Sequence, residues 1–158
     1  MKNLTKVVTV LLLVVMTCSF VGCGSKKKYE NAVQEFYDAV LESQVNLNTL
    51  ADAIYNNWYD AIYNDDFRGD INIAIAYAFS DNSTIVDEIE ANDETIKALY
   101  KLAKESELSY EVKAVMQAYN EYYEFVVNVS GSFSTFKESN ETNKKALATA
   151  LKNLNYEI

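Results

Sequence analysis

The side chains that could do chemistry in this chain are carboxylates and phenols. The sequence has 23 Asp and Glu residues and 12 Tyr residues, but no His. Mechanisms that need imidazole are therefore excluded, including the Ser-His-Asp triad, zinc sites that contain His and the Glu-x-x-His motif of di-iron bundles. Paired carboxylates, such as Asp65 with Asp66 or Glu88 with Glu90, could in principle act as acid and base in a glycosidase. Residues one or two positions apart do not face each other on a helix, so we interpret these pairs as a consequence of the acidic composition.

Three tyrosines follow one another at intervals of four residues. Tyr55, Tyr59 and Tyr63 would share one face of a helix. Such a face could stack on sugar rings or hold a peptide, and these residues are our candidate interaction patch. Three later tyrosines could lie opposite the patch: Tyr119, Tyr122 and Tyr123. Tyrosines at a helix seam more often bury the ring and leave the hydroxyl in water, and we favour that structural interpretation.

The Asp-rich segment at residues 64–70 invites a calcium-binding interpretation. An EF-hand loop beginning at Asn64 would put Arg68 and Ile75 at ligand positions, and neither side chain can ligate calcium there. We therefore interpret the segment as a solvated turn and predict no metal and no cofactor. The remaining alternative is weak ion binding by three of its carboxylates, Asp65, Asp66 and Asp70.

The start of the chain has the order of charges and apolar residues found in a secretory signal. Two lysines precede an apolar run at residues 7–16, which is shorter than the roughly 20 apolar residues of a membrane-spanning helix. Residues 20–23, Phe-Val-Gly-Cys, place a small residue directly before Cys23. This end resembles the lipobox of bacterial lipoproteins, which implies that Cys23 receives a diacylglycerol and becomes the first residue of the mature chain. The alternatives are an ordinary cleaved signal that frees a secreted product and an uncleaved anchor helix.

This resemblance implies three regions: a signal peptide at residues 1–22, a lipidated cysteine with a basic tether at 23–28, and a helical domain at 29–158. Two acyl chains on Cys23 would anchor the protein stably, and the lysines that follow would add about 1 kcal/mol each near anionic headgroups. We expect the protein on the extracellular face of the cell membrane. Because Cys18 would be removed and Cys23 acylated, no thiol would remain for a disulfide, a metal or a nucleophile.

The acidic residues gather in the first half of the mature chain. Residues 29–96 contain fifteen Asp or Glu and one cation, Arg68, whereas residues 97–158 contain eight of each sign. A surface this negative repels phosphates and other anionic polymers, so we predict no nucleic-acid partner. Solubility alone is the alternative explanation for the charge, and we favour it.

The elements that must position these side chains are helices. From residue 29 to 62, apolar residues recur at intervals of three and four, and the chain has no Pro to interrupt a helix before Asn64. The helix would be ~52 Å long, and its near-seven-residue repeat is typical of a bundle. Residues 71–79 alternate like a strand, but a single strand would have no partner, and Ala fills three of the alternate positions. We therefore predict a short buried helix there.

Further helices are expected after this segment. Residues 84–87 have the form of a capping box that opens a helix, so residues 70–105 together could run back along the first helix. After a turn at 106–109, one apolar stripe continues in phase to the C-terminus, with a weak point at Gly131 where a kink or a break would cost little. Without a break this helix would be ~75 Å long. The predicted fold is all-α, an elongated antiparallel bundle of three long helical layers, one of them split into two helices.

Two stretches carry a further resemblance. Residues 58–63, Trp-Tyr-Asp-Ala-Ile-Tyr, and residues 128–136, Asn-Val-Ser-Gly-Ser-Phe-Ser-Thr-Phe, resemble marks of an uncharacterised group of small exported helical proteins of Gram-positive gut bacteria. The resemblance implies a helical fold and an extracytoplasmic location, but no activity. We expect a lipid-anchored, non-catalytic interaction module at the cell envelope, whose partner is an envelope protein, a peptide or a glycan. The alternative is a carboxylate- and tyrosine-based ligand-binding protein or hydrolase that acts on cell-wall or extracellular material.

Overall fold

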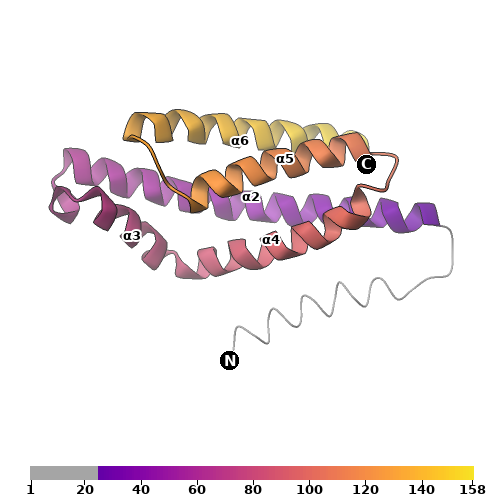
Figure 1. Ribbon diagram of the computed structural model, residues 1–158, viewed down its shortest axis with the longest axis horizontal. Helices are drawn as coiled ribbons and strands as arrows, with labels where there is room; N and C mark the ends of the chain where they lie inside the picture. The colour runs from indigo at the N-terminus through magenta and orange to yellow at the C-terminus, as the bar shows by residue number, and fades with distance from the viewer. Residues whose placement is uncertain (1–24) are drawn as a thin grey trace, which may run out of the picture.

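The computed structural model describes residues 25–158, and all their regular structure is helical (Figure 1). The predicted all-α antiparallel bundle is confirmed. The predicted signal peptide and the predicted lipid-attachment residue, Cys23, lie outside the described residues. In chain order the elements are α2 (Ser25–Tyr63), the 3-10 turn η1 (Asp66–Gly69), α3 (Ile71–Asp81), α4 (Ser83–Ala103), α5 (Ser109–Val127) and α6 (Phe133–Asn155).

Helix α2 is the central helix of the bundle, and every other element contacts it. It has 39 residues, so it is ~58 Å long. The predicted stripe is buried from Val33 to Trp58, as its period required. Ile62, the last residue of the predicted stripe, is instead 42% exposed. The structure accounts for this difference, because α6 begins short of the end of α2 and leaves that end covered on fewer sides (Figure 1).

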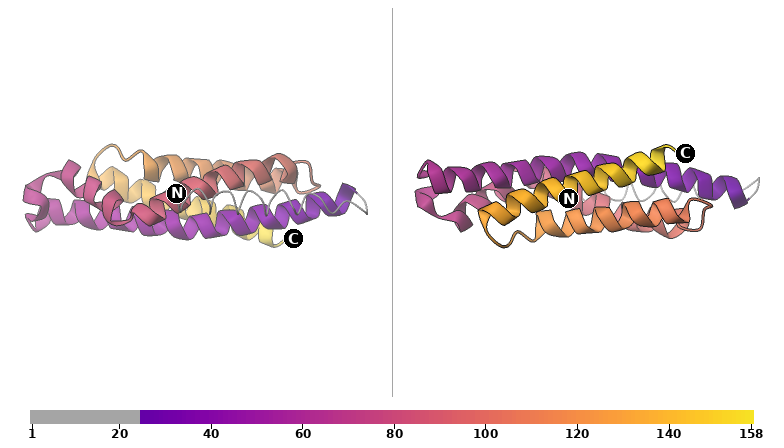
Figure 2. Two further views of the ribbon diagram at one scale, coloured as in Figure 1. Left: turned by 90° about the horizontal axis from the view of Figure 1, so that it is seen from below. Right: turned by 90° about the horizontal axis from the view of Figure 1, so that it is seen from above.

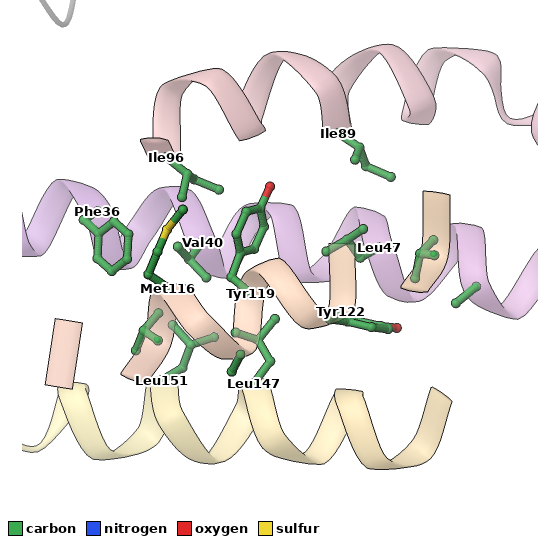
Figure 3. Close-up of a cluster of buried hydrophobic side chains, with 14 of the residues drawn as sticks. Phe36, Val40, Leu47, Ile89, Ile96, Met116, Tyr119, Tyr122, Leu147 and Leu151 are labelled. Atoms are coloured by element: carbon green, nitrogen blue, oxygen red, sulfur yellow. The ribbon is translucent and has the colours of Figure 1, made fainter. Parts of the chain in front are cut away.

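The core lies where α2, α4, α5 and α6 meet along the middle of the bundle (Figures 2 and 3). Aliphatic side chains from α2 and α4 face α5, and leucines of α6 close the opposite side. Within residues 25–158, no helix combines the length and the hydrophobicity that crossing a bilayer requires. The buried side chains drawn and labelled in Figure 3 are Phe36, Val40, Leu47, Ile89, Ile96, Met116, Tyr119, Tyr122, Leu147 and Leu151.

Residues 71–81 form helix α3, as predicted, but the prediction that this helix is buried is wrong. Only Ala74 and Ala78 are buried, whereas Ile73 is 40% and Tyr77 51% exposed. The two alanines lie on the side that α2 covers, where the Asn57 side chain donates a hydrogen bond to the Ala74 carbonyl oxygen (3.1 Å). Because few elements lie beyond α3, its larger apolar side chains remain partly in water.

Helices α3 and α4 are the two halves of the split layer. The predicted capping box at residues 84–87 does not form, because α4 already begins at Ser83. Asn82 stands between the helices, and its side chain donates to the Ala78 carbonyl oxygen (2.8 Å), so it completes the end of α3 instead of capping α4. Helix α4 runs through residues 92–94 without a break.

The long last helix does not form, because the chain reverses between α5 and α6. Gly131 adopts a φ of +91°, in the region that favours glycine, and a side-chain capping box joins Ser132 and Thr135 at the start of α6. Helix α6 then packs back along α5. The apolar stripe kept its phase across Gly131 because α5 and α6 both contribute to one core. The third layer is thus a helical hairpin.

Candidate functional site

The three predicted patch residues form a row on α2, which we call the tyrosine ladder: Tyr55, Tyr59 and Tyr63. Ring centroids are 6.5 Å apart between Tyr55 and Tyr59 and 4.6 Å apart between Tyr59 and Tyr63. Exposure increases along the ladder, from half-buried Tyr55 to 42% at Tyr59 and 62% at Tyr63. The ladder therefore presents ring surface to water at the end of α2 that is far from Ser25.

The ladder rests on Phe133, the first residue of α6. The Phe133 ring stacks on Tyr55 with centroids 5.0 Å apart and planes at 25°, and it lies 6.2 Å from the Tyr59 ring and 6.3 Å from the Tyr63 ring. The reversal at Gly131 brings Phe133 to this place. The sequence placed Phe133 only in an apolar stripe, because a periodic pattern does not reveal which helix a side chain meets.

Below the ladder, aromatic rings continue into the core. Trp58, the single tryptophan, is 4% exposed and its ring lies 6.0 Å from Phe133 and 5.6 Å from Phe136. Phe136 in turn stacks on Phe125 of α5 at 4.8 Å. Offset and tilted ring pairs of this kind add to the stability gained by burial. The ladder is thus the exposed edge of a packed aromatic cluster, which holds its rings in fixed positions.

The suggestion that Tyr119, Tyr122 and Tyr123 lie opposite the ladder is wrong for the first two, because both side chains are fully buried in the centre of the bundle (Figure 3). Tyr123 is half-buried, and its ring lies 6.0 Å from the Tyr119 ring. The Tyr119 hydroxyl donates to Asp93 Oδ1 at 3.4 Å, and Lys97 Nζ lies 2.7 Å from Asp93 Oδ2. Burial raises the pKa of the Tyr119 phenol well above its usual value, and the charge of Asp93 raises it further. The hydrogen bond to Asp93 raises the pKa of Lys97.

Tyr122 joins three helices through its hydroxyl group. Its oxygen lies 2.9 Å from Asn48 Oδ1 on α2 and 3.3 Å from Asn140 Oδ1 on α6. A phenol has one proton, so one of the two amides must turn its NH₂ group toward the phenol oxygen for both contacts to be hydrogen bonds. Burial raises the pKa of Tyr122 well above its usual value, and nearby Asp52 raises it further.

The turn after the ladder is acidic and has an unusual backbone. Asp65, Phe67 and Arg68 all have φ between 55° and 57°, a left-handed conformation that side chains rarely adopt. Phe67 packs against Tyr77 with ring centroids 5.5 Å apart. The Asp70 carboxylate caps α3, since its Oδ1 accepts from the backbone N–H groups of residues 72 and 73. No group of three acidic or thiol side chains within residues 25–158 is arranged to hold a metal ion.

A cavity of about 670 Å³ lies at the other end of the bundle, between the start of α2, the turn after α4 and the C-terminal residues. Tyr29, Val33 and Leu108 give it an apolar lining, and Glu30 and Glu157 are among its acidic residues. No sequence pattern predicts this cavity, because its walls come from three separate parts of the chain. No predicted site residue lines it.

Comparisons with protein-family models, with curated proteins and with solved structures find nothing that matches this chain. The resemblance to the uncharacterised exported proteins therefore stays a prediction. The function is inferred from the ladder, its support and the charges around it.

Proposed function

We propose that the chain is a non-catalytic interaction module, held by lipid on Cys23 at the extracellular face of the cell membrane. The observation that carries this proposal is the exposed, pre-formed tyrosine ladder at the end of α2. Along the helix, residues 55–63 lie roughly 45–57 Å from Ser25. A module tethered through residues just before α2 could therefore hold its contact surface well away from the lipid headgroups.

The burial and the hydrogen-bond partners of the polar groups in the core support a non-catalytic role. Among the described residues, Asp93 is the one buried carboxylate, and Lys97 and Tyr119 already occupy its oxygens. The raised pKa of Tyr119 keeps its phenol protonated at neutral pH, so it cannot act as a base there. A general acid or base must reach the substrate, and both Asp93 and Tyr119 are enclosed between helices.

A partner that contacts the ladder should be captured by cross-linking in intact envelopes. A photo-crosslinking analogue of phenylalanine placed at position 63 should give a discrete adduct, because Tyr63 is the most exposed ladder residue. The matched control is the same analogue at Tyr110, which is 80% exposed on α5. Adducts of equal yield and mass at both positions, or no adduct at position 63, would contradict an interaction role for the ladder.

A second candidate is a carboxylate-based ligand-binding protein or hydrolase, and the cavity near Glu30 favours it. Its apolar lining and acidic residues resemble the composition of small-molecule sites. A ligand that binds only the folded state raises the unfolding temperature, so calcium or cell-wall sugar fragments should shift it if this function is correct. Glu30→Gln should abolish such a shift, whereas Glu138→Gln on exposed α6 should not. The absence of any shift would rule out these ligands.

A further inference from the structure

We propose that the tyrosine ladder receives a cationic peptide segment, one that carries Lys or Arg beside apolar side chains. This inference rests on the proposed role as an interaction module and adds the chemistry of the partner. Three properties of the end of α2 lead to it: apolar ring surface that is already ordered, a net negative charge beside it despite Arg68 in the following turn, and access from the side and the end.

The apolar contribution comes from α2. Tyr59, Ile62 and Tyr63 are 42%, 42% and 62% exposed, and they lie within two helical turns of one another. Phe133 supports the two ring systems from below, so little side-chain entropy remains to be lost when a partner binds. The faces of tyrosine rings attract ammonium and guanidinium groups, while the ring edges and Ile62 suit aliphatic side chains.

The charge around the ladder selects the sign of the partner. Asp60 follows Tyr59 directly, and Asp65 and Asp66 begin the turn after Tyr63. Within the described part of the chain, none of these three carboxylates lies within ion-pair distance of a cation. Complementary charge increases the rate of association and discriminates against wrong partners. A cationic segment would meet attraction from this surface, whereas anionic glycans and phosphate polymers would be repelled.

A second copy of this chain is a poor occupant for the same reason. If two ladders met face to face, they would bring two sets of Asp60, Asp65 and Asp66 together, and like charges destabilise such a contact. A neutral glycan could stack on the rings and donate hydroxyl hydrogen bonds to the carboxylates, but it has no positive charge to pair with them. Charge complementarity therefore favours the cationic peptide over both.

The shape of the bundle leaves this surface accessible. In all three views, the end of α2 and the turn that follows extend past the start of α6 (Figures 1 and 2). The partner can therefore approach the ladder from the side of α2 and from its end without displacing another helix. Phe133, at the start of α6, marks the inner limit of the exposed ring surface.

Trp58 supplies a direct test, because it is the single tryptophan and packs against Phe133 under the ladder. The full chain, purified in neutral detergent, is titrated with an octapeptide that alternates Lys and Leu. We expect a saturable change in Trp58 emission, with an affinity at least tenfold lower in Tyr59→Ser/Tyr63→Ser. Exchanging the three aspartates for Asn should also weaken binding several-fold, and added salt should weaken it in the unaltered protein.

Matched controls separate the outcomes. Tyr110→Ser and Tyr156→Ser change tyrosines that are 80% and 71% exposed elsewhere, and they should bind like the unaltered protein. Calorimetric titration provides a second measure of binding, and circular dichroism shows that each variant is folded. A peptide that alternates Glu with Leu lacks the cationic side chains, and one that alternates Lys with Ser lacks the apolar ones. Each should therefore bind at least tenfold more weakly.

Three results would overturn the proposal. These are equal affinity in the ladder and control variants, equal affinity for the Glu-Leu peptide, and no binding of the Lys-Leu peptide at all. Binding of an uncharged N-acetylglucosamine trimer that depends on the ladder, without binding of the Lys-Leu peptide, would identify the partner as a glycan. That result would contradict a cationic peptide as the partner, but it would agree with the proposed role as an interaction module. The proposed role as an interaction module is tested separately by the envelope cross-linking experiment. Equal adducts at positions 63 and 110 would contradict that role.

Discussion

The ring of Phe133 stacks on the ring of Tyr55, with centroids 5.0 Å apart, and this contact joins the start of α6 to the exposed face of α2. It exists because the chain reverses at Gly131 and is capped immediately afterwards by Ser132. The turn between α5 and α6 thus positions the ring that supports the tyrosine ladder on α2.

Gly131→Ala should destabilise the protein by about 1–3 kcal/mol. The alanine would have to adopt a φ of +91°, and its Cβ would come within 2.8 Å of Thr135 Oγ1, which takes part in the cap of α6. Urea denaturation gives the loss as a lower midpoint. Ser130→Ala is the matched control, because it changes an exposed residue of the same loop. Equal midpoints for the two variants would show that the reversal does not depend on glycine.

Tyr122→Phe should cost about 1–3 kcal/mol, because it removes the hydroxyl that Asn48 and Asn140 share and leaves buried polar atoms without a partner. Tyr110→Phe, at an 80% exposed site, should leave the free energy of unfolding unchanged within error. Thermal or urea unfolding measures both. A Tyr122→Phe protein as stable as the control would mean that the three-helix contact contributes nothing.

The protein should lose stability as the pH rises above about 10. Burial raises the pKa of Tyr119 and of Tyr122, and an unfolded tyrosine titrates near pH 10. The folded state therefore keeps protons that the unfolded state releases. The stabilising contribution is complete below pH ~10 and declines above it, toward the raised folded-state pKa values. The raised pKa of Lys97 acts in the same direction.

Absorbance at 295 nm, which follows tyrosinate, checks this pH dependence. Two of the 12 tyrosines, Tyr119 and Tyr122, should form tyrosinate only as the protein unfolds. In the Tyr119→Phe/Tyr122→Phe double variant, that late step should disappear. If all tyrosines of the native protein titrate together near pH 10, the two buried phenols are accessible to solvent and the described core is wrong.

Arg68→Gly should stabilise the protein by up to about 1 kcal/mol. Arg68 has a φ of 57°, which glycine adopts without the steric cost that a side chain incurs. Arg68→Ala removes the same charge but keeps a Cβ, so it should give no such gain. Unfolding midpoints of the two variants at one pH separate the effects, and an equal gain in both would assign the change to charge instead of backbone strain.

Local regularity explains which parts of the fold were predictable. The end of α2 just before Asn64 followed from an unbroken apolar period and the absence of Pro, and the turn at residues 106–109 followed from polar residues between two periodic segments. The period could not reveal the reversal at Gly131, because an uninterrupted helix and a hairpin with both halves facing one core give the same pattern. Whether Gly131 adopts a positive φ, so that the chain reverses, depends on how the helix that follows packs against the rest of the bundle.

The candidate site shows the same limit. Spacing placed Tyr55, Tyr59 and Tyr63 in one row, which the structure has, but it could not identify Phe133 as the ring beneath them. The suggestion that Tyr119, Tyr122 and Tyr123 lie opposite the ladder failed for Tyr119 and Tyr122, because residue type does not distinguish a core phenol with a polar partner from a surface one. Similarly, the isoleucines of α3 suggested burial, but burial depends on how many elements surround a helix.

The proposed lipid anchor at Cys23 determines the location of the protein. The mass of the N-terminal peptide from native material tests this anchor most directly. We expect an N-terminus at Cys23, with a diacylglycerol on its sulfur, and release of Cys23→Ala protein into the medium. An intact Met1, or an N-terminus beyond Cys23, would contradict a module tethered at the outer face of the membrane.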